Sequence, residues 1–249
     1  MANYSPRSEF LTGMRDTFPL VLGAIPFGII YGALAVTSGL TPAASVAMSL
    51  FVFAGASQFI ATGLFASAAG GLLIIFTTLI VNLRHSLYGI TLSPHLNHLP
   101  RRWLVPLAFW LTDETFAVAA TYFNEHPERP SKEWYMLGSS LFMYTNWQIC
   151  TIIGVIAGQA IPNPAAWGLD FAMVVAFIGI LVPRIASRPT LVAAVTAGAI
   201  SLAANGLPNR IGLFLATLIG IGSGVLASRI WPGDPDKSKT IVLRETQND

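Results

Sequence analysis

The stretch Asn82-Leu83-Arg84-His85-Ser86-Leu87-Tyr88 places an arginine and a histidine inside a segment that is otherwise apolar enough to cross a lipid bilayer. A charged side chain at the bilayer centre costs about 2.5–3.5 kcal/mol on insertion scales, so such residues usually face the protein interior and have a function. On a helix, Leu83, Leu87 and Ile90 share one arc, and polar residues occupy the rest of the circle. The stretch therefore predicts a membrane helix with one lipid-facing side and one broad polar side.

The composition indicates a membrane protein. Of the 249 residues, 53% are hydrophobic and only 10% are charged, whereas a soluble domain carries about 25% charged residues. The net charge of +2 is too small to indicate a nucleic-acid partner, and the basic residues are better interpreted as topology signals in a lipid bilayer. We therefore expect an all-α, polytopic helix bundle of about seven to eight transmembrane segments, some of them broken or re-entrant.

Apolar stretches of spanning length divide the chain. They cover about residues 17–36, 41–66, 70–92, 103–123, 134–161, 169–186, 189–207 and 210–231. The connections between them are too short to hold a soluble domain. The expected organisation is an N-terminal cytoplasmic segment (1–16), a single transmembrane domain (17–231) and a C-terminal cytoplasmic tail (232–249).

The orientation follows from the distribution of Lys and Arg, which are enriched in cytoplasmic connections. With eight spans and a cytoplasmic N-terminus, most basic residues fall inside, and Arg101, Arg102 and Arg210 fall outside. Both termini are therefore expected in the cytoplasm. The Arg101-Arg102 pair lies on the wrong side in this arrangement, which a re-entrant or broken segment among the first three would correct.

Small residues and proline mark several segments as broken or closely packed. Pro26 lies in the middle of the first segment, and the second is interrupted at Phe53-Ala-Gly-Ala-Ser-Gln-Phe59. Broken helices often build transporter binding sites, because half-helix ends direct amide or carbonyl dipoles at the substrate. Gly55, Ser57 and Gln58 are therefore candidate functional residues, although close packing explains them equally well.

Three pairs of glycines have the spacing that favours close helix packing. They are Gly28/Gly32, Gly154/Gly158 and Gly220/Gly224. We interpret these pairs as packing contacts. No internal repeat between the two halves of the chain is evident in the sequence.

Two adjacent carboxylates, Asp113 and Glu114, lie in the fourth apolar stretch. If residues 93–102 form the tip of a helical hairpin, Arg84 and Asp113 lie at matching depth near the middle of the bilayer and can pair. Because adjacent residues differ by about 100° on a helix, one carboxylate can hold Arg84 while the other faces a cavity and binds a proton or an ammonium group. The alternative is a static ion pair that locks two helices together.

Other residues of the opening stretch complete the candidate set. His85 is a candidate proton relay, or a core histidine bonded to a neighbouring helix. Asn82 and Tyr88 lie on the same polar side of the helix. No ligand spacing predicts a metal site, and no nucleophile or nucleotide motif predicts an enzyme or a cofactor.

Five motifs in one order, between residues 13 and 117, resemble the AzlC/YgaZ family, and the resemblance runs over about residues 10–230. They are Gly13-Met-Arg-Asp-Thr-Phe-Pro-Leu20, Pro26-Phe-Gly-Ile-Ile-Tyr-Gly-Ala-Leu-Ala35, Phe53-Ala-Gly-Ala-Ser-Gln-Phe59, Asn82-Leu-Arg-His-Ser-Leu-Tyr-Gly89 with Ser93-Pro-His-Leu96, and Thr112-Asp-Glu-Thr-Phe-Ala117. The resemblance implies the large subunit of a bacterial branched-chain amino acid exporter in the inner membrane, driven by the proton gradient. It also implies a small hydrophobic partner subunit of the AzlD/YgaH type.

The residues fit such a substrate. A zwitterionic amino acid needs a cation or a helix N-terminus for its carboxylate, a carboxylate or carbonyl for its ammonium group, and an apolar pocket. Arg84, Asp113 or Glu114, and the broken backbone at 55–58 can supply the polar hosts, with Tyr31 as a wall of the pocket. A channel-like passive pore and a membrane scaffold subunit are the alternative functions, and an intramembrane enzyme lacks a nucleophile.

Overall fold

The computed structural model describes residues 5–160, 178, 182, 185, 187–204 and 211–232. The chain forms two compact units, Met1–Met173 and Val174–Asp249. Every regular element among these residues is a helix, as the sequence predicts. The segment expected over 169–186 falls almost entirely outside the described residues.

Three helical stretches of the described chain are long and apolar enough to cross a membrane. They are Pro6–Thr37, Gly71–Leu96 and Lys132–Ala160, all in the first unit. The protein is therefore a multi-pass membrane protein.

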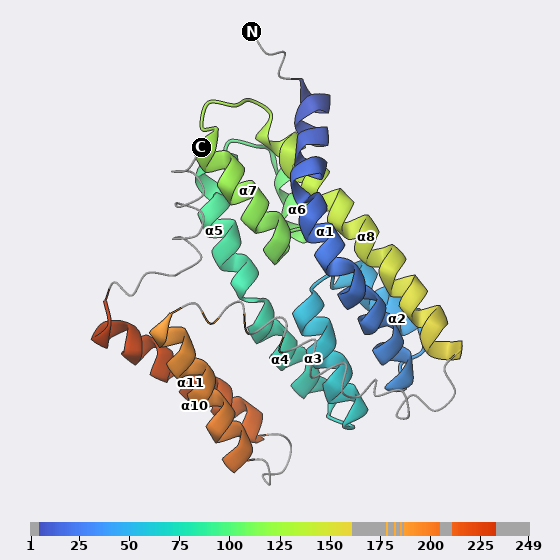
Figure 1. Ribbon diagram of the computed structural model, residues 1–249, viewed down its shortest axis with the longest axis vertical. Helices are drawn as coiled ribbons and strands as arrows, with labels where there is room; N and C mark the ends of the chain where they lie inside the picture. Colours follow the sequence, from blue (N-terminus) through green and yellow to red (C-terminus); the bar gives the residue numbers. More distant parts are fainter. Residues whose placement is uncertain are drawn as a thin grey trace. The chain divides into compact units, whose positions relative to one another are not determined.

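The long helices α1 (Pro6–Thr37) and α8 (Lys132–Ala160) lie side by side and run in the same direction (Figure 1). Glycines permit this contact, because a Cβ added at Gly154 would lie 2.1 Å from the carbonyl oxygen of Ile29, and one at Gly32 would lie 2.3 Å from that of Thr151. The packing role predicted for the first two glycine pairs is therefore confirmed. Pro26 does not break α1, which continues to Thr37.

The second apolar stretch is broken, as predicted. It forms α2 (Pro42–Phe51) and α3 (Gly55–Ala66), and Phe53 between them has a φ of 43°, a region that costs a residue with a Cβ about 1–2 kcal/mol. The ring of Phe65, near the end of α3, lies 3.7 Å from where a Cβ at Gly39 would be, just before α2. The α2–α3 pair therefore enters and leaves at the end of the unit where α1 ends, and is re-entrant.

The third stretch returns to the end where α1 begins. Helices α4 (Gly71–Asn82) and α5 (Arg84–Leu96) follow one another in nearly one direction, separated only by Leu83 (Figure 1). His95, in the last turn of α5, lies 3.4 Å from the ammonium group of Lys132 at the start of α8. This contact places the end of α5 beside the start of α8.

The fourth stretch, expected to form one spanning segment over residues 103–123, instead turns back. It forms α6 (Arg101–Phe109) and α7 (Asp113–Glu125). At the start of α6, Trp103 contacts Trp134 with ring centroids 5.0 Å apart. At the end of α7, the Tyr122 hydroxyl donates to the carboxylate of Glu9. Both ends of the α6–α7 pair therefore lie where α1 begins.

The two re-entrant pairs meet at Tyr144, near the middle of α8. The ring of Tyr144 lies 4.8 Å from that of Phe53, at the turn of α2–α3, and 6.0 Å from that of Trp110, at the turn of α6–α7. Helix α1 with α2–α3, and α4–α5 with α6–α7, thus repeat one arrangement in opposite directions. Inverted repeats of this kind are common in secondary transporters.

The re-entrant pairs also correct the expected position of Arg101 and Arg102. These residues precede Trp103, which contacts Trp134, and Arg129 on the adjoining connection pairs with Glu9. The two arginines therefore lie at the same end of the unit as Glu9 and Arg129. The mismatch in the distribution of basic residues at this pair disappears.

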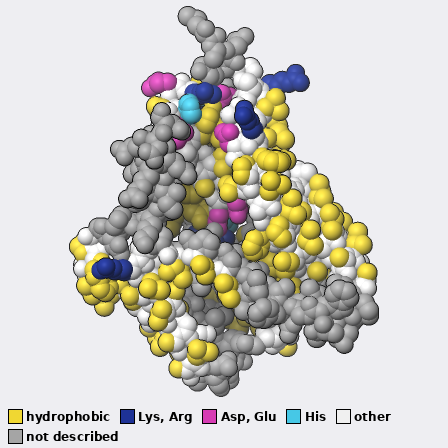
Figure 2. All heavy atoms as spheres, viewed as in Figure 1, with side chains coloured by type: hydrophobic (Ala, Val, Ile, Leu, Met, Phe, Trp, Pro, Cys, Tyr) yellow, Lys and Arg dark blue, Asp and Glu magenta, His cyan; other side chains and the backbone are white. Residues whose placement is uncertain are grey.

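The surface agrees with a lipid environment. The arc predicted to face lipid is exposed, with Leu83 at 56%, Leu87 at 64% and Ile90 at 69% of their full accessible surface. Figure 2 shows hydrophobic side chains over much of the visible surface, and charged side chains gathered mainly around the end where α1 begins.

In the second unit, α10 (Arg188–Ala203) packs on α11 (Ile211–Ile230). A Cβ added at Gly220 would lie 2.8 Å from the Cβ of Ala197, and one at Gly224 would lie 2.9 Å from that of Ala193. The third glycine pair is therefore also a packing contact.

The α1–α8 contact gives a test by substitution. We expect Gly154→Ala to lower the free energy of unfolding by about 1–3 kcal/mol, because its methyl group meets the backbone of α1. The matched change Gly23→Ala adds a methyl group with no heavy atom within 4 Å on the same helix pair, and should be neutral or stabilising. Thermal unfolding in detergent measures both, and equal midpoints for the two variants would contradict the packing.

Candidate functional site

An ion pair joins the first residues of two helices deep in the first unit. Nη1 of Arg84, where α5 begins, lies 3.2 Å from Oδ2 of Asp113, where α7 begins, and the side chains are 22% and 19% exposed. The pairing that their matched depth predicted is therefore present. A positive charge at a helix N-terminus opposes the helix dipole, so Asp113 offsets both the charge of Arg84 and its unfavourable position.

Tyr88 and His85 extend this pair along α5. The Tyr88 hydroxyl donates to Oδ1 of Asp113 at 2.9 Å, so the two carboxylate oxygens are held by different partners. The Tyr88 ring stacks on Phe116 of α7 with centroids 4.3 Å apart, and His85 lies 5.7 Å from Tyr88. These contacts fix the orientation of the Asp113 carboxylate.

Buried polar atoms without a hydrogen-bond partner lie at the two helix breaks, before α5 and before α7. They include Oδ1 of Asn82, Nε of Arg84 and Nε1 of Trp110. A buried unpaired donor or acceptor costs about 1–3 kcal/mol, and such atoms in a native structure usually have a ligand or an ordered water. The set offers two donors and one acceptor within a few residues of the ion pair.

Glu114 has a different environment from Asp113. It is partly exposed, and no hydrogen bond or ion pair of its side chain is found among the described residues. It follows Asp113 in the first turn of α7, where a carboxylate is stabilised by the helix dipole. The adjacent carboxylates thus divide as the sequence suggested, with Asp113 holding Arg84 and Glu114 turned elsewhere.

The start of α7 is fixed locally. Thr112 and Thr115 form a capping box, in which each side chain accepts a hydrogen bond from the backbone of the other. This arrangement satisfies backbone donors at the helix start and ends the turn after α6. It positions Asp113 and Glu114 in the interior of the unit.

Gln58 of the second stretch and Tyr31 of the first belong to a separate, fully buried cluster. Gln58 accepts from Nε1 of Trp147 at 3.1 Å and donates to Oγ of Ser49 at 2.9 Å, and the Tyr31 hydroxyl donates to the carbonyl oxygen of Ser45. Oγ of Ser49 also bonds Thr151 at 2.8 Å. Tyr31 and Gln58 are therefore held by α2, α3 and α8 rather than pointing into an open space.

The start of α3 differs from that of α7. Its N-cap is Ala54, which makes no side-chain capping bond, and the Ser57 hydroxyl donates back to the Ala54 carbonyl oxygen. A Cβ at Gly55 would lie 3.1 Å from the Trp147 ring. An N-terminus without a side-chain cap in the interior of the unit presents backbone N–H groups suited to an anion.

The predicted residues thus form two groups that the structure does not join directly. Arg84, Asp113, Tyr88 and His85 lie together on α5 and α7, and Asn82 and Glu114 are their chain neighbours. The other group is Tyr31, Gly55, Ser57 and Gln58. Two aromatic residues of α8, one turn apart, lie beside these groups. Tyr144 contacts Trp110 at the turn before α7, and Trp147 contacts Tyr31 and Gln58 of the second group.

Sequence reasoning missed Trp110, Tyr144 and Trp147 as site residues. An aromatic residue in an apolar stretch usually indicates core packing, so their types alone gave no signal. Trp110 directly precedes the break before α7, and Trp147 follows an asparagine on a membrane helix. The feature that could have identified Trp110 and Trp147 as site residues is their position beside polar residues in a membrane segment.

Comparison with known proteins identifies the family. The AzlC protein family matches residues 19–161. This chain belongs to the AzlC family. The match runs from within α1 to the end of α8, so it includes both re-entrant pairs and the Arg84–Asp113 ion pair.

Individual relatives agree with this assignment. The inner membrane protein YgaZ of Escherichia coli K12 is 31% identical over 92% of this chain and 95% of its own length. The branched-chain amino acid transport protein AzlC of Bacillus subtilis 168 is 30% identical over 72% of this chain and 70% of its own. An uncharacterized membrane protein of Archaeoglobus fulgidus is 32% identical over 94% of this chain. No solved structure gives a significant match.

The ion pair can be tested by a double-mutant cycle. We expect Arg84→Gln and Asp113→Asn each to lower the midpoint of thermal unfolding, because each leaves one half-buried charge uncompensated. The double variant should be less destabilised than the sum of the two, by about 1 kcal/mol of coupling. Strict additivity in detergent unfolding would show that the two side chains do not interact.

Proposed function

We propose that this AzlC-family protein is a secondary transporter that exports branched-chain or other small apolar amino acids across a bacterial inner membrane. In this proposal the proton gradient drives export, and a small membrane subunit of the AzlD/YgaH type assists. The name of the Bacillus subtilis relative supports the substrate class, and that of the Escherichia coli relative supports the membrane. Family membership makes an amino acid the first substrate to test.

The observation that carries the proposal is the Arg84–Asp113 ion pair at the starts of two half-helices, beside unpaired polar atoms. A static structural pair needs no unpaired neighbours, whereas a substrate site needs donors and acceptors that a ligand can satisfy. Nε of Arg84 and Nε1 of Trp110 can donate to a carboxylate, and Oδ1 of Asn82 can accept from an ammonium group. Together they match the two ends of a zwitterionic amino acid.

The remaining candidate residues have supporting roles in this proposal. Glu114 binds a proton or the substrate ammonium, and His85 passes protons to it. Tyr88 orients Asp113. In the second group, Gly55 and Ser57 bring the uncapped N-terminus of α3 towards the substrate. Tyr31 and Gln58 are bonded within the closed cluster and hold that helix start in place.

The inverted arrangement supports a transport cycle. Two re-entrant pairs that enter from opposite ends and meet at Tyr144 can each open one side of a central site in turn. We propose that both termini of the chain lie in the cytoplasm, on either side of the membrane domain (17–231). Arg7, Arg15 and Arg129, at the same end of the unit as Glu9, support this for the N-terminus. The basic residues of the tail 232–249 support it for the C-terminus.

Transport in proteoliposomes tests the function. Labelled valine, leucine and methionine, with glutamate as a non-apolar control, are followed with and without a pH gradient and with and without the small subunit. We expect saturable transport of the apolar amino acids that requires the pH gradient for accumulation. Flux that persists without a gradient and does not saturate would indicate a passive pore, and an absence of flux under all conditions would favour a scaffold.

Single substitutions test the site itself. Arg84→Gln should reduce leucine transport about 10- to 100-fold, because a hydrogen bond to a charged group contributes about 1.5–3 kcal/mol. Arg101→Gln is the matched control, since Arg101 is exposed at the start of α6, at the end of the unit where α1 begins, and not beside the ion pair. Equal rates for the two variants, at equal protein levels in the membrane, would remove Arg84 from the substrate site.

A further inference from the structure

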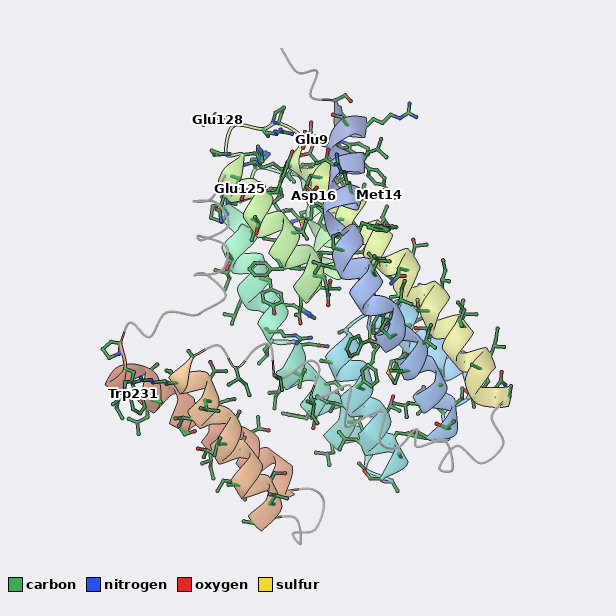
Figure 3. The ribbon with its side chains drawn as sticks, in the orientation of Figure 1. Glu9, Met14, Asp16, Glu125, Glu128 and Trp231 are labelled. Carbon is green, nitrogen blue, oxygen red and sulfur yellow. The ribbon has the colours of Figure 1, made fainter. Side chains whose placement is uncertain are left out.

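A cavity of about 620 Å³ lies at the end of the first unit where α1 begins. Three elements and the connection after α7 line it. The lining residues are Thr12, Asp16, Ala117, Val118, Thr121, Tyr122, Glu125, His126, Arg129 and Tyr135. Figure 3 shows Asp16 and Glu125, from α1 and α7, at this end of the unit together with Glu9. The volume is typical of a small-molecule site.

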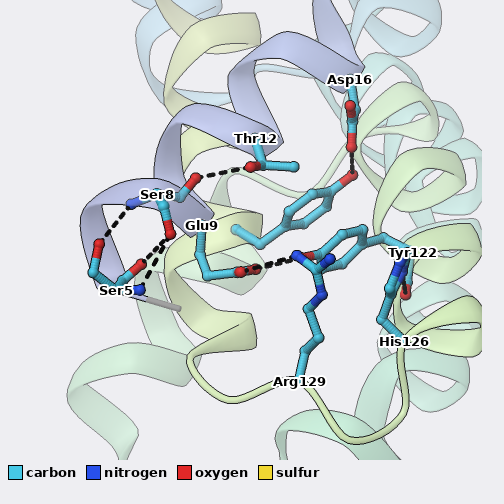
Figure 4. A network of polar contacts seen from close by, with 9 residues as sticks. Ser5, Ser8, Glu9, Thr12, Asp16, Tyr122, His126 and Arg129 are labelled. Carbon is cyan, nitrogen blue, oxygen red and sulfur yellow. Dashed lines mark hydrogen bonds and ion pairs between the residues drawn. The ribbon is translucent and has the colours of Figure 1, made fainter. Parts of the chain in front are cut away.

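The walls of the cavity are held by hydrogen bonds among α1, α7 and α8 (Figure 4). Tyr122 donates to Glu9, which is 1% exposed, and Arg129 donates to Glu9 at 3.3 Å and to the Tyr122 hydroxyl at 2.8 Å. The Tyr135 hydroxyl donates to Oδ2 of Asp16 at 2.8 Å. The rings of Tyr122 and Tyr135 stack with centroids 3.7 Å apart. The cavity therefore has a preformed aromatic wall.

The charges around the cavity favour a cation. Arg129 is balanced by the buried carboxylate of Glu9. The carboxylates of Asp16 and Glu125 are both exposed and remain without a paired lysine or arginine among the described residues. His126 also lines the cavity, and its Nδ1 donates to the carbonyl oxygen of Tyr122 at 3.2 Å. Two carboxylates beside aromatic rings form a suitable host for an ammonium group.

Helix α7 connects this cavity to the deep ion pair. The residues of α7 that line the cavity continue the face that carries Glu114 one turn earlier. They are Ala117, Val118, Thr121, Tyr122 and Glu125, at spacings of three, four, seven, eight and eleven residues. Ala117 is about 4.5 Å along the helix axis from Glu114. The cavity therefore ends close to the carboxylate beside the Arg84–Asp113 pair.

We propose that this cavity is an access site for the transported amino acid, where Asp16 and Glu125 receive its ammonium group before it moves along α7 to Glu114. The apolar side chain of the substrate lies against Ala117 and Val118. This inference rests on the proposed function and adds a second binding site to it. The ligand class is a small apolar molecule with a primary ammonium group.

Transport kinetics in proteoliposomes test the access site. Asp16→Asn keeps an acceptor for Tyr135, and Glu125→Gln keeps the length of the side chain, so both remove charge with little change of shape. We expect the KM for leucine to rise about fivefold in the double variant, with a smaller effect on the maximal rate. Arg84→Gln should act mainly on the maximal rate.

A ligand series on the wild-type protein provides an independent measurement. Isoamylamine carries the ammonium group and the branched chain of leucine without its carboxylate, and isocaproate carries the carboxylate without the ammonium group. We expect isoamylamine to compete with labelled leucine more strongly than isocaproate, and only the isoamylamine competition to weaken in the double variant. The comparison of the two ligands on the wild-type protein does not depend on the folding of any variant.

Glu128→Gln is the matched control. Glu128 is exposed on the connection between α7 and α8, three residues after Glu125, and does not line the cavity. A KM that is unchanged in the double variant, or raised equally by Glu128→Gln, would overturn the access site and leave the transporter intact. No competition by isoamylamine would overturn it as well. If the wild-type protein moves no amino acid at all, the proposed function fails and the access site fails with it.

Discussion

The ion pair between Arg84 and Asp113 sets the conditions for the first unit. An arginine in a membrane segment is tolerated only where protein groups satisfy it, and here the partner is the first residue of a half-helix from another part of the chain. One contact therefore neutralises the charge of Arg84 and joins the starts of α5 and α7. The break before α5 and the break before α7 lie at the two sides of the same contact.

This constraint explains why the interior contains re-entrant helices. Backbone groups exposed by a break cannot be hydrated in lipid, so they must be capped or covered by protein. Thr112 and Thr115 cap α7, and the close glycine contact of α1 with α8 provides a frame against which α2–α3 and α6–α7 pack. Tyr144 contacts Phe53 at one turn and Trp110 at the other, so its ring covers part of both turns.

At the end of the unit where α1 begins, paired polar side chains join the helices. Glu9, Tyr122, Arg129, Tyr135 and Asp16 tie α1 to α7 and α8 with charge-assisted hydrogen bonds. Such bonds are stronger than neutral ones and give geometric specificity. These bonds hold the C-terminal part of α7, whereas its first residue, Asp113, forms the ion pair. The single helix α7 therefore connects the two polar regions of the unit.

The sequence alone determined the membrane character, the all-helical fold, the lipid-facing arc of Leu83, Leu87 and Ile90, the glycine contacts, the break near Phe53 and the match in depth between Arg84 and Asp113. Each depends on local composition or on a fixed helical rise, and can therefore be read from neighbouring residues. Only the tertiary structure decided that residues 103–123 turn back, that Arg101 and Arg102 lie with Glu9, and that Gln58 is bonded within a closed cluster. A short apolar pair of helices has the same composition whether it crosses the bilayer or returns, because the choice depends on which distant side chains, here Tyr144 and Trp134, are available to cover its turn and its ends.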